Sequence, residues 1–173
     1  MRLCAKPSDT VADPKSFPAI EPRHLWQIIE ERPGYSCKWV SITQRDFVQP
    51  NGSTGCFHQV ELPHDGTVIL AYQDSQVLLA REYRPAVGGI IWGLPGGRGD
   101  DNETPLQTAE RELLEETGLK AGQLLPLTSF YPIGAVLKHE IRAFLALDVK
   151  KVGEIDQELR TRNNWSFGIK SLV

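Results

Sequence analysis

The sequence predicts one mixed α/β (α+β) domain in which several strands accompany a central helix. Short segments rich in Val, Ile, Leu, Thr and aromatic residues recur along the chain. Pro, Asn, Asp or Gly separate them, as is typical of strands joined by turns. Residues 105–117 have apolar residues at helical spacing instead. Strands combined with one well-marked helix indicate a layered domain in which the helix packs on a sheet.

The first 50 residues are predicted to form a separate N-terminal region, with the main domain at residues 51–173. Residues 1–20 are rich in Pro, Ser and Asp and have little apolar periodicity, which is typical of an extended arm. Residues 22–32 carry Leu and Ile at helical spacing and predict a short helix that Pro33-Gly34 would end. The strands expected in the rest of this region are residues 38–43 and 47–48.

The main domain is expected to contain a series of strands, with no repeat or low-complexity segment among them. Asp74-Ser75 is the expected tight turn between two of the strands, and Gly88-Gly89 separates off a short one. The expected strands are residues 59–62, 67–73, 76–83, 90–92, 124–131, 140–149 and 159–162.

The helix at residues 105–117 has clear signals at both ends. Thr104 suits the N-cap, Pro105 suits the first helical position, and Gln107 would complete a capping box. Gly118 suits the left-handed position that follows a helix. The residues expected to meet the sheet are Leu106, Ala109 and Leu113.

Three glutamates of this helix, Glu112, Glu115 and Glu116, share one face because their spacing is i, i+3, i+4. Like charges repel on a helix, and negative charge is disfavoured near a helix C-terminus. A solvated acidic face is the simple interpretation of such a run. Divalent cations such as Mg²⁺ or Mn²⁺ prefer carboxylate oxygens and would explain the crowding better. The Gly-rich turn at residues 94–99 would let a ligand approach the backbone closely.

The spacing of residues 97–119 resembles the Nudix box, G-x5-E-x7-R-E-U-x-E-E-x-G-U with U aliphatic, at every position. A chance match has odds on the order of one in ten million for a chain of this length. The resemblance implies a Nudix hydrolase, whose fold is a mixed β-sheet sandwiched between helices and whose box forms a loop–helix–loop. The matching residues are Gly97, Glu103, Arg111, Glu112, Leu113, Glu115, Glu116, Gly118 and Leu119.

The resemblance also implies a metal site. Glu112, Glu115 and Glu116 would hold two to three Mg²⁺ (or Mn²⁺) ions on a diphosphate, and Glu115 would also be catalytic. A main-chain carbonyl near Gly96 would add a ligand. Such ions neutralise the diphosphate and lower the pKa of bound water, so no Ser/His or Cys/His pair is needed. The box residues with structural roles would be Gly97, Glu103, Arg111 and Gly118, with Arg111 pairing a box glutamate.

Residues 77–85 and 92–97 resemble the ADP-ribose pyrophosphatase branch of this family, which typically reads Q-Y-R and then W-E-L-P-A-G there. Gly93 and Gly96 depart from that pattern. The branch implies cleavage of ADP-ribose to AMP and ribose 5-phosphate. The alternatives are GDP-mannose or another nucleotide sugar, a nucleoside triphosphate, and a non-catalytic module that senses a nucleotide.

Three further side chains are candidates for substrate binding. Arg84 would grip the substrate phosphates, because its planar fork suits phosphate oxygens. Trp39 would stack on a nucleobase, although a strand tryptophan is more often part of the core. Glu140 would line the sugar site, although an acid at a strand end is usually solvated.

The general base is expected on a loop after the box, where this branch commonly places a carboxylate that orients the attacking water. The acids there are Glu154, Asp156 and Glu158, and Glu158 is the candidate because it directly precedes the last expected strand. A solvated acidic loop is the simpler interpretation of any one of them. A metal-bound hydroxide would need no base.

A homodimer is expected, because relatives in this branch often exchange N-terminal segments. Residues 1–50, including Trp26, would then pack on the partner. The alternative is an N-terminal region docked on its own subunit.

Composition excludes other classes of function. The 173 residues include 19 basic and 22 acidic side chains, for a net charge of −3, which gives no broad case for binding nucleic acid. No run of about 18 apolar residues is present, so no membrane span is expected. The N-terminus does not read as a signal peptide, and the cysteines lack metal-site spacing. We therefore expect a cytoplasmic protein with reduced thiols at Cys4, Cys37 and Cys56.

Overall fold

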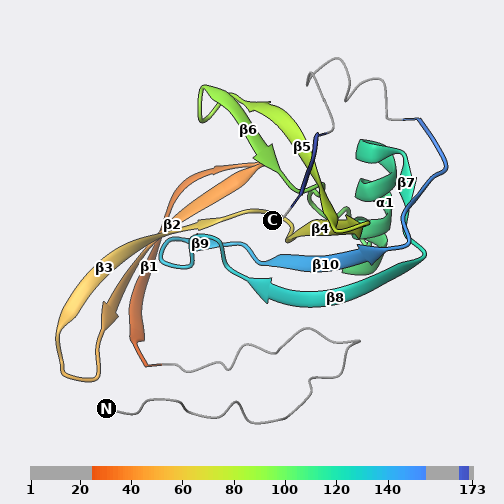
Figure 1. Ribbon diagram of the computed structural model, residues 1–173. Helices are drawn as coiled ribbons and strands as arrows, with labels where there is room; N and C mark the ends of the chain where they lie inside the picture. Colours follow the sequence, from red (N-terminus) through yellow and green to blue (C-terminus); the bar gives the residue numbers. More distant parts are fainter. Residues whose placement is uncertain (1–24, 155–167, 172–173) are drawn as a thin grey trace, which may run out of the picture.

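The computed structural model describes residues 25–154 and the backbone of residues 168–171, which form three β-sheets and one helix (Figure 1). The N-terminal sheet has the strand order β1-β2-β3-β9, and the main sheet has the order β12-β5-β4-β10-β8, with β6 paired to β5. A two-stranded sheet joins β11 to β7. The elements are β1 (Gln27–Cys37), β2 (Val40–Val48), β3 (Thr54–Glu61), β4 (Gly66–Gln73), β5 (Gln76–Arg84), β6 (Gly89–Gly93), α1 (Pro105–Thr117), β7 (Leu119–Lys120), β8 (Gln123–Phe130), β9 (Leu137–Lys138), β10 (Ile141–Leu147), β11 (Lys150–Lys151) and β12 (Gly168–Ser171).

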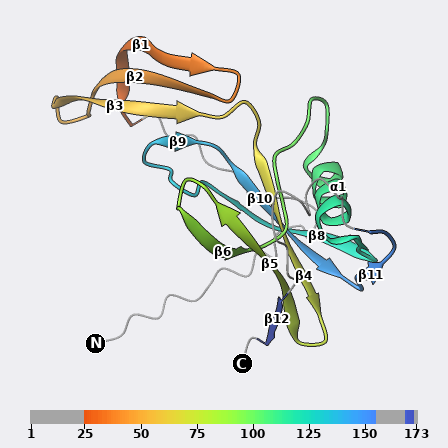
Figure 2. The same cartoon turned by 90° about the horizontal axis from the view of Figure 1, so that it is seen from above.

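The main sheet is mixed, as predicted. β10 runs parallel to β4, from Ile141 beside Gly66 to Ala146 beside Ala71, and it runs antiparallel to β8. α1 packs on this sheet, and the N-terminal sheet projects away from the helix (Figures 1 and 2). The buried residues that join helix and sheet are Ile69, Ala71, Ala109, Leu113, Phe144 and Ala146.

The ends of α1 are as the sequence predicts. The Thr104 side chain accepts a hydrogen bond from the Gln107 amide, and the Gln107 side chain accepts one from the Thr104 amide. Gly118 has a φ of 68°, and its N–H donates to the Leu114 carbonyl at 2.7 Å. The prediction for Leu106 is wrong, because this side chain is 44% exposed. It lies in the first turn, beyond the part of the helix that covers the buried cluster.

The predicted helix at residues 22–32 is also wrong where the structure describes it, because β1 begins at Gln27. β1 pairs with β2 from Gln27 beside Val48 to Cys37 beside Val40. Register shifts occur around Ile28 and around Pro33, so the proline that was expected to end a helix sits at an irregularity of a strand. Backbone pairing with β2 thus outweighs the local helical pattern.

The other strands agree with the expected order, with shifted ends. The segments expected at 38–43 and 47–48 merge into β2. Asp74 and Ser75 both have positive φ, 52° and 60°, as a tight hairpin turn requires. The strand expected at 159–162 lies outside the described residues. β3 joins the same sheet as β1 and β2, and the domain boundary at residue 50 stays a prediction.

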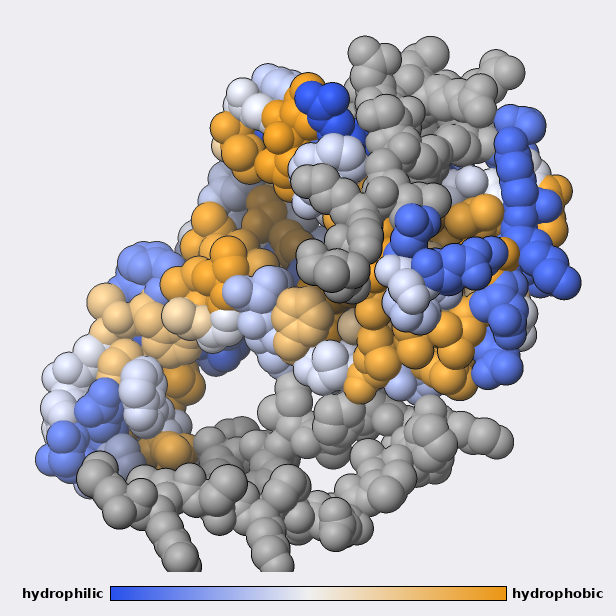
Figure 3. Space-filling model, viewed as in Figure 1, coloured by the Kyte–Doolittle hydropathy of each residue, from blue (hydrophilic) through white to orange (hydrophobic). Residues whose placement is uncertain are grey.

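Apolar side chains are exposed at the tip of the β5–β6 hairpin and on the N-terminal sheet (Figure 3). Within the described residues, no helix has the length and apolar character needed to cross a membrane.

Candidate active site

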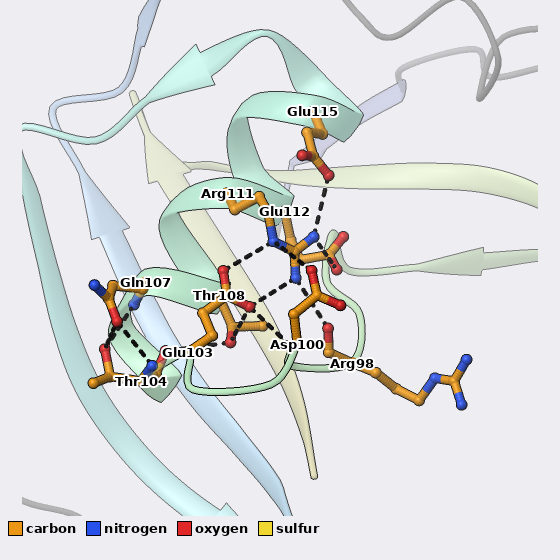
Figure 4. A network of polar contacts seen from close by, with 9 residues as sticks. All are labelled: Arg98, Asp100, Glu103, Thr104, Gln107, Thr108, Arg111, Glu112 and Glu115. Atoms are coloured by element: carbon orange, nitrogen blue, oxygen red, sulfur yellow. Dashed lines mark hydrogen bonds and ion pairs between the residues drawn. The ribbon is translucent and has the colours of Figure 1, made fainter. Parts of the chain in front are cut away.

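Arg111 lies at the centre of a network of carboxylates on α1 and on the loop before it (Figure 4). Its guanidinium donates to Glu103 twice, from Nε to Oε1 at 2.9 Å and from Nη2 to Oε2 at 3.0 Å. Nη1 donates to Glu112 Oε1 at 2.9 Å and to Glu115 Oε2 at 3.1 Å. Nη2 also donates to the Arg98 carbonyl at 3.0 Å. One cation therefore offsets three carboxylates, which explains how like charges are tolerated here.

Glu103 is the best stabilised of these carboxylates. Its hydrogen bonds with Arg111 are the main reason that its pKa is lowered to about 2. The Thr108 hydroxyl and the Asp100 amide also donate to Oε2, at 2.9 and 3.1 Å. Glu103 therefore links the loop to the helix, and both of its carboxylate oxygens accept hydrogen bonds from the protein.

Glu112 and Glu116 are the two carboxylates of this site whose charged form is disfavoured by burial. Burial raises the pKa of Glu112, and Arg111 opposes that rise. Burial raises the pKa of Glu116 to about 7, although the Gly96 amide donates to its Oε2 at 2.8 Å. A nearby cation would stabilise both carboxylates in their charged form. The donor set suits a hard divalent cation such as Mg²⁺ or Mn²⁺.

The carboxylates are held by protein groups in the structure. The described residues contain no three His, Cys, Asp or Glu side chains that already converge as metal ligands. Glu112 and Glu115 bind Arg111, and Glu116 binds the Gly96 amide. In each of these contacts one carboxylate oxygen is used, so the other oxygen of Glu112, Glu115 and Glu116 would be the one offered to a cation. Glu115 is the more accessible of the two partners of Arg111, since its side chain is 44% exposed whereas that of Glu112 is 13% exposed.

The loop before α1 is fixed to β4 by backbone hydrogen bonds. Two amides of β4 donate to the carbonyls of Pro95 and Gly97, each at 2.8 Å. Between them Gly96 has a φ of 149°, and a Cβ there would lie 2.2 Å from the Thr67 carbonyl oxygen. A Cβ on Gly97 would lie 2.3 Å from Glu112 Oε1. In the described part of the chain no backbone amide donates to the Gly96 carbonyl, and its role as a metal ligand stays a prediction.

Arg84, at the end of β5, is electrostatically linked to the carboxylates. Its guanidinium forms an ion pair with Glu82, which lies two residues earlier on the same face of the strand. The charge of Arg84 lowers the pKa of Glu116 and the charge of Glu82 raises it, both as lesser effects than burial. Arg84 is therefore within electrostatic range of Glu116, and its role in phosphate binding stays a prediction.

Trp39 follows β1 and lies beside residues 94–104, the loop before α1 that we call the box loop. The Arg98 guanidinium lies 5.0 Å from the centre of the indole ring, and Lys38 Nζ lies 4.6 Å from it. A cavity of about 370 Å³ opens between these elements. Its polar and aromatic lining includes Lys38, Trp39, His64, Arg98, Asp100 and Glu112. Trp39 is 54% exposed, so it is not part of the core.

The remaining candidates are less closely connected to the carboxylate network. The Glu140 carboxylate accepts from Arg142 Nη2 at 2.6 Å, and the Glu140 amide donates to Asp65 at 3.1 Å. Glu154 forms an ion pair with Lys151 at 3.3 Å. Asp156 and Glu158 lie outside the described residues, so the choice of general base stays a prediction.

Sequence reasoning missed Glu82, Lys38 and Arg98. Glu82 could have been noticed because it replaces the Gln of the Q-Y-R motif and alternates with Arg84 on one strand face. Lys38 and Arg98 gave no such signal, because they are 60 positions apart and only the fold brings both beside the Trp39 ring.

Glu116 predicts how the stability of the metal-free protein depends on pH. Its pKa is about 7 in the folded protein against an ordinary value of 4.5, so the folded state keeps a proton that the unfolded state releases. In EDTA the free energy of unfolding should therefore fall as the pH rises through this window, by roughly 1–3 kcal/mol. Urea unfolding of the wild type and of Glu116→Gln tests this. The variant should lose less stability over the window, and equal losses would contradict the prediction.

Comparison with known proteins gives a consistent result. The family model of the NUDIX domain matches residues 62–164, more than half of the chain. A crystal structure described as an ADP compounds hydrolase superposes with a TM-score of 0.74 over 88% of this chain and 82% of that one, at 18% identity. That likeness shows the fold and confirms the predicted architecture.

Two curated relatives resemble the chain in sequence. The CMP-5'-(N-acetyl-N-hydroxy-3-aminopropyl)phosphonate hydrolase of Streptomyces rubellomurinus is 31% identical over 125 residues, which are 71% of this chain and 60% of the relative. The ADP-ribose pyrophosphatase of Bacillus subtilis is 28% identical over 120 residues, 69% of this chain and 65% of the relative. The chain thus spans less than two thirds of the length of either relative.

Proposed function

Because the chain belongs to the NUDIX family, we propose that it is a divalent-metal-dependent pyrophosphohydrolase that cleaves the diphosphate of a nucleoside diphosphate sugar, with ADP-ribose as the first candidate. The observation that carries the proposal is a pair of largely buried carboxylates, Glu112 and Glu116, on one face of α1, with Glu116 held by the Gly96 amide of the preceding loop. Two to three Mg²⁺ or Mn²⁺ ions held there would neutralise the diphosphate and lower the pKa of a bound water.

The side chains of this site have distinct roles in the proposal. Glu112 and Glu116, fixed by Arg111 and by the Gly96 amide, provide carboxylate oxygens in set positions. Glu115 is the more exposed partner of Arg111 and can turn toward solvent, which suits a catalytic role. Arg84 grips the phosphate oxygens, and Glu82 orients its guanidinium.

The ends of the substrate would be recognised outside the metal site. Trp39, which is 54% exposed, would stack on a nucleobase in place of a cation that lies over its ring. Glu140, held by Arg142, would accept hydrogen bonds from sugar hydroxyls. Cleavage of ADP-ribose would yield AMP and ribose 5-phosphate.

A substrate panel tests the proposed function. It should include ADP-ribose, GDP-mannose, a CMP ester of a phosphonate, 8-oxo-dGTP and a dinucleoside polyphosphate, each with Mg²⁺ and with Mn²⁺ and with products identified by mass. We expect the highest kcat/KM for ADP-ribose. A clearly higher kcat/KM for 8-oxo-dGTP or the dinucleoside polyphosphate would contradict the resemblance to the ADP-ribose pyrophosphatase branch. Tight binding of ADP-ribose without turnover would indicate a nucleotide sensor instead of an enzyme.

The general base is expected to be Glu158. Glu158→Gln should lower kcat by about a hundredfold or more with little change in KM, since general base catalysis contributes about that much. Glu154→Gln and Asp156→Asn serve as matched controls from the same acidic stretch and should retain most of the activity. Wild-type turnover in all three variants would favour a metal-bound hydroxide without a base.

A homodimer through the N-terminal region is also part of the proposal. All eleven residues of β1 are exposed, they include Ile28 and Ile29, and β1 is an edge strand of its sheet. Exposed apolar edges are typical of protein contacts. Light scattering at micromolar concentration should give the mass of two chains. Ile29→Glu should shift this mass toward one chain, whereas Val152→Glu, at an exposed site far along the chain, should not. A monomeric wild type would contradict the prediction.

A further inference from the structure

The cavity between Trp39 and the box loop has a charge pattern that the scissile diphosphate does not explain. Two exposed cations, Lys38 and Arg98, lie beside the same indole ring at 4.6 and 5.0 Å from its centre. Among the residues that the structure describes, neither forms an ion pair with a carboxylate. Cation–π contacts at exposed sites are weak, so these two cations remain available to a stronger anionic partner.

The acids of the lining share one cation, because Arg111 also pairs with Glu103 and Glu115. Arg111 lies 3.8 Å from Asp100 and 2.9 Å from Glu112, so both acids have a cationic partner. His64 lies 3.8 Å from Asp101. Among the described residues, Lys38 and Arg98 are thus the lining cations that no carboxylate pairs with, and they form a local positive site beside Trp39.

The cavity also adjoins the proposed metal site, since Glu112 and Arg111 belong to its lining. Its volume of about 370 Å³ lies within the range of small-molecule sites, which is roughly 300–1,000 Å³. A ligand with its diphosphate at Glu112 and Glu116 could thus extend into the cavity. There Lys38 and Arg98, which lie over the Trp39 ring, are available to an anion.

We propose that this cavity, which we call the Lys38–Arg98 subsite, binds a phosphate monoester that the substrate carries outside its scissile diphosphate. The proposal rests on the proposed function and narrows its substrate class to nucleoside diphosphate derivatives with an additional phosphate on a ribose. Arg98 and Lys38 would donate to the monoester oxygens, since charge-assisted hydrogen bonds to phosphate suit both side chains.

Equilibrium binding of product-like probes tests the subsite without requiring turnover. The probes are 5'-AMP, adenosine 2',5'-bisphosphate, adenosine 3',5'-bisphosphate and α,β-methylene ADP, each titrated into the full chain by calorimetry in excess Mg²⁺. None of them contains a hydrolysable diphosphate, and α,β-methylene ADP carries its second phosphate on the chain rather than on the ribose. At least one bisphosphate should bind about tenfold more tightly than 5'-AMP.

Arg98→Gln and Lys38→Gln should each remove most of that gain while changing the affinity for 5'-AMP by less than about threefold. Lys150→Gln, at an exposed lysine of β11, should retain the gain. The gain should also shrink at high salt, because exposed charges are screened. Equal affinity of all bisphosphates and 5'-AMP would overturn the proposal. Tighter binding seen only for α,β-methylene ADP would also overturn it. So would a gain in bisphosphate affinity that both Arg98→Gln and Lys38→Gln retain.

The same measurements separate this inference from the proposed function. If the bisphosphates show the gain and no substrate of the panel is hydrolysed, the subsite stands and the enzymatic proposal fails. If ADP-ribose is hydrolysed and the gain is absent, the enzyme stands and the subsite fails.

Discussion

Replacing Glu116 with Gln is expected to lower kcat by about a thousandfold or more, which corresponds to roughly 4 kcal/mol of lost transition-state stabilisation. The substitution removes a partly buried carboxylate from the proposed metal site. The fold should be retained, because the Gln amide oxygen can still accept from the Gly96 amide, and a neutral side chain is buried more easily than a charged one. Steady-state kinetics on the best substrate, together with thermal unfolding, measure both effects.

Glu110→Gln is the matched control for this experiment. Glu110 is an exposed glutamate on the same helix, at a position the box leaves free, so its substitution should leave kcat almost unchanged. Chelation of the wild type by EDTA should abolish turnover as Glu116→Gln does, and added Mg²⁺ should restore the wild type alone. Full activity in EDTA, or wild-type kcat in the Glu116 variant, would refute the metal-dependent mechanism.

Arg111→Ala is expected to cause a large loss in the free energy of unfolding. This substitution removes the partner of Glu103, Glu112 and Glu115 at once, and it leaves two of these side chains less than 15% exposed without a cation. Breaking a largely buried ion pair on one side costs several kcal/mol, and since Arg111 is 26% exposed we expect about 2–4 kcal/mol. Urea unfolding in EDTA gives the measurement, with Arg81→Ala, an exposed arginine, as the control.

Repeating the unfolding of Arg111→Ala and of the wild type in Mg²⁺ tests whether a cation binds the same carboxylates. A divalent cation on Glu112 and Glu116 would replace part of the lost positive charge, so Mg²⁺ should stabilise Arg111→Ala more than it stabilises the wild type. A variant that unfolds at the wild-type urea concentration would show that the network contributes little. A variant destabilised equally with and without Mg²⁺ would show that the cation does not bind these carboxylates.

The helix and its carboxylates could be predicted because their signals are local. Thr104 and Gln107 cap α1 within four residues, and Gly118 ends it, so neighbouring residues determine both ends. The spacing of the glutamates places them on one face in any helix. The central position of Arg111 is less local, because it depends on a loop that brings Glu103 back to the helix.

The errors arise where distant pairing decides the structure. Residues 27–32 have a helical pattern, yet they pair with β2, and only that pairing reveals the strand. The short strands β7, β9 and β11 are two residues each and exist because a partner strand is present. The cavity beside Trp39 could not be predicted, because its two cations come from segments whose packing the sequence does not encode locally.

The parallel pairing of β4 and β10 has a consequence for how the protein reaches this structure. It joins residues that are 75 positions apart in the chain, and both strands contribute to the sheet on which α1 packs. During synthesis α1 is complete before β10 emerges from the ribosome, so Leu113 has only part of its final surroundings at that stage. Contacts of such sequence separation slow folding. The carboxylate site should therefore assemble late, as one of the last parts of the molecule to acquire its native geometry.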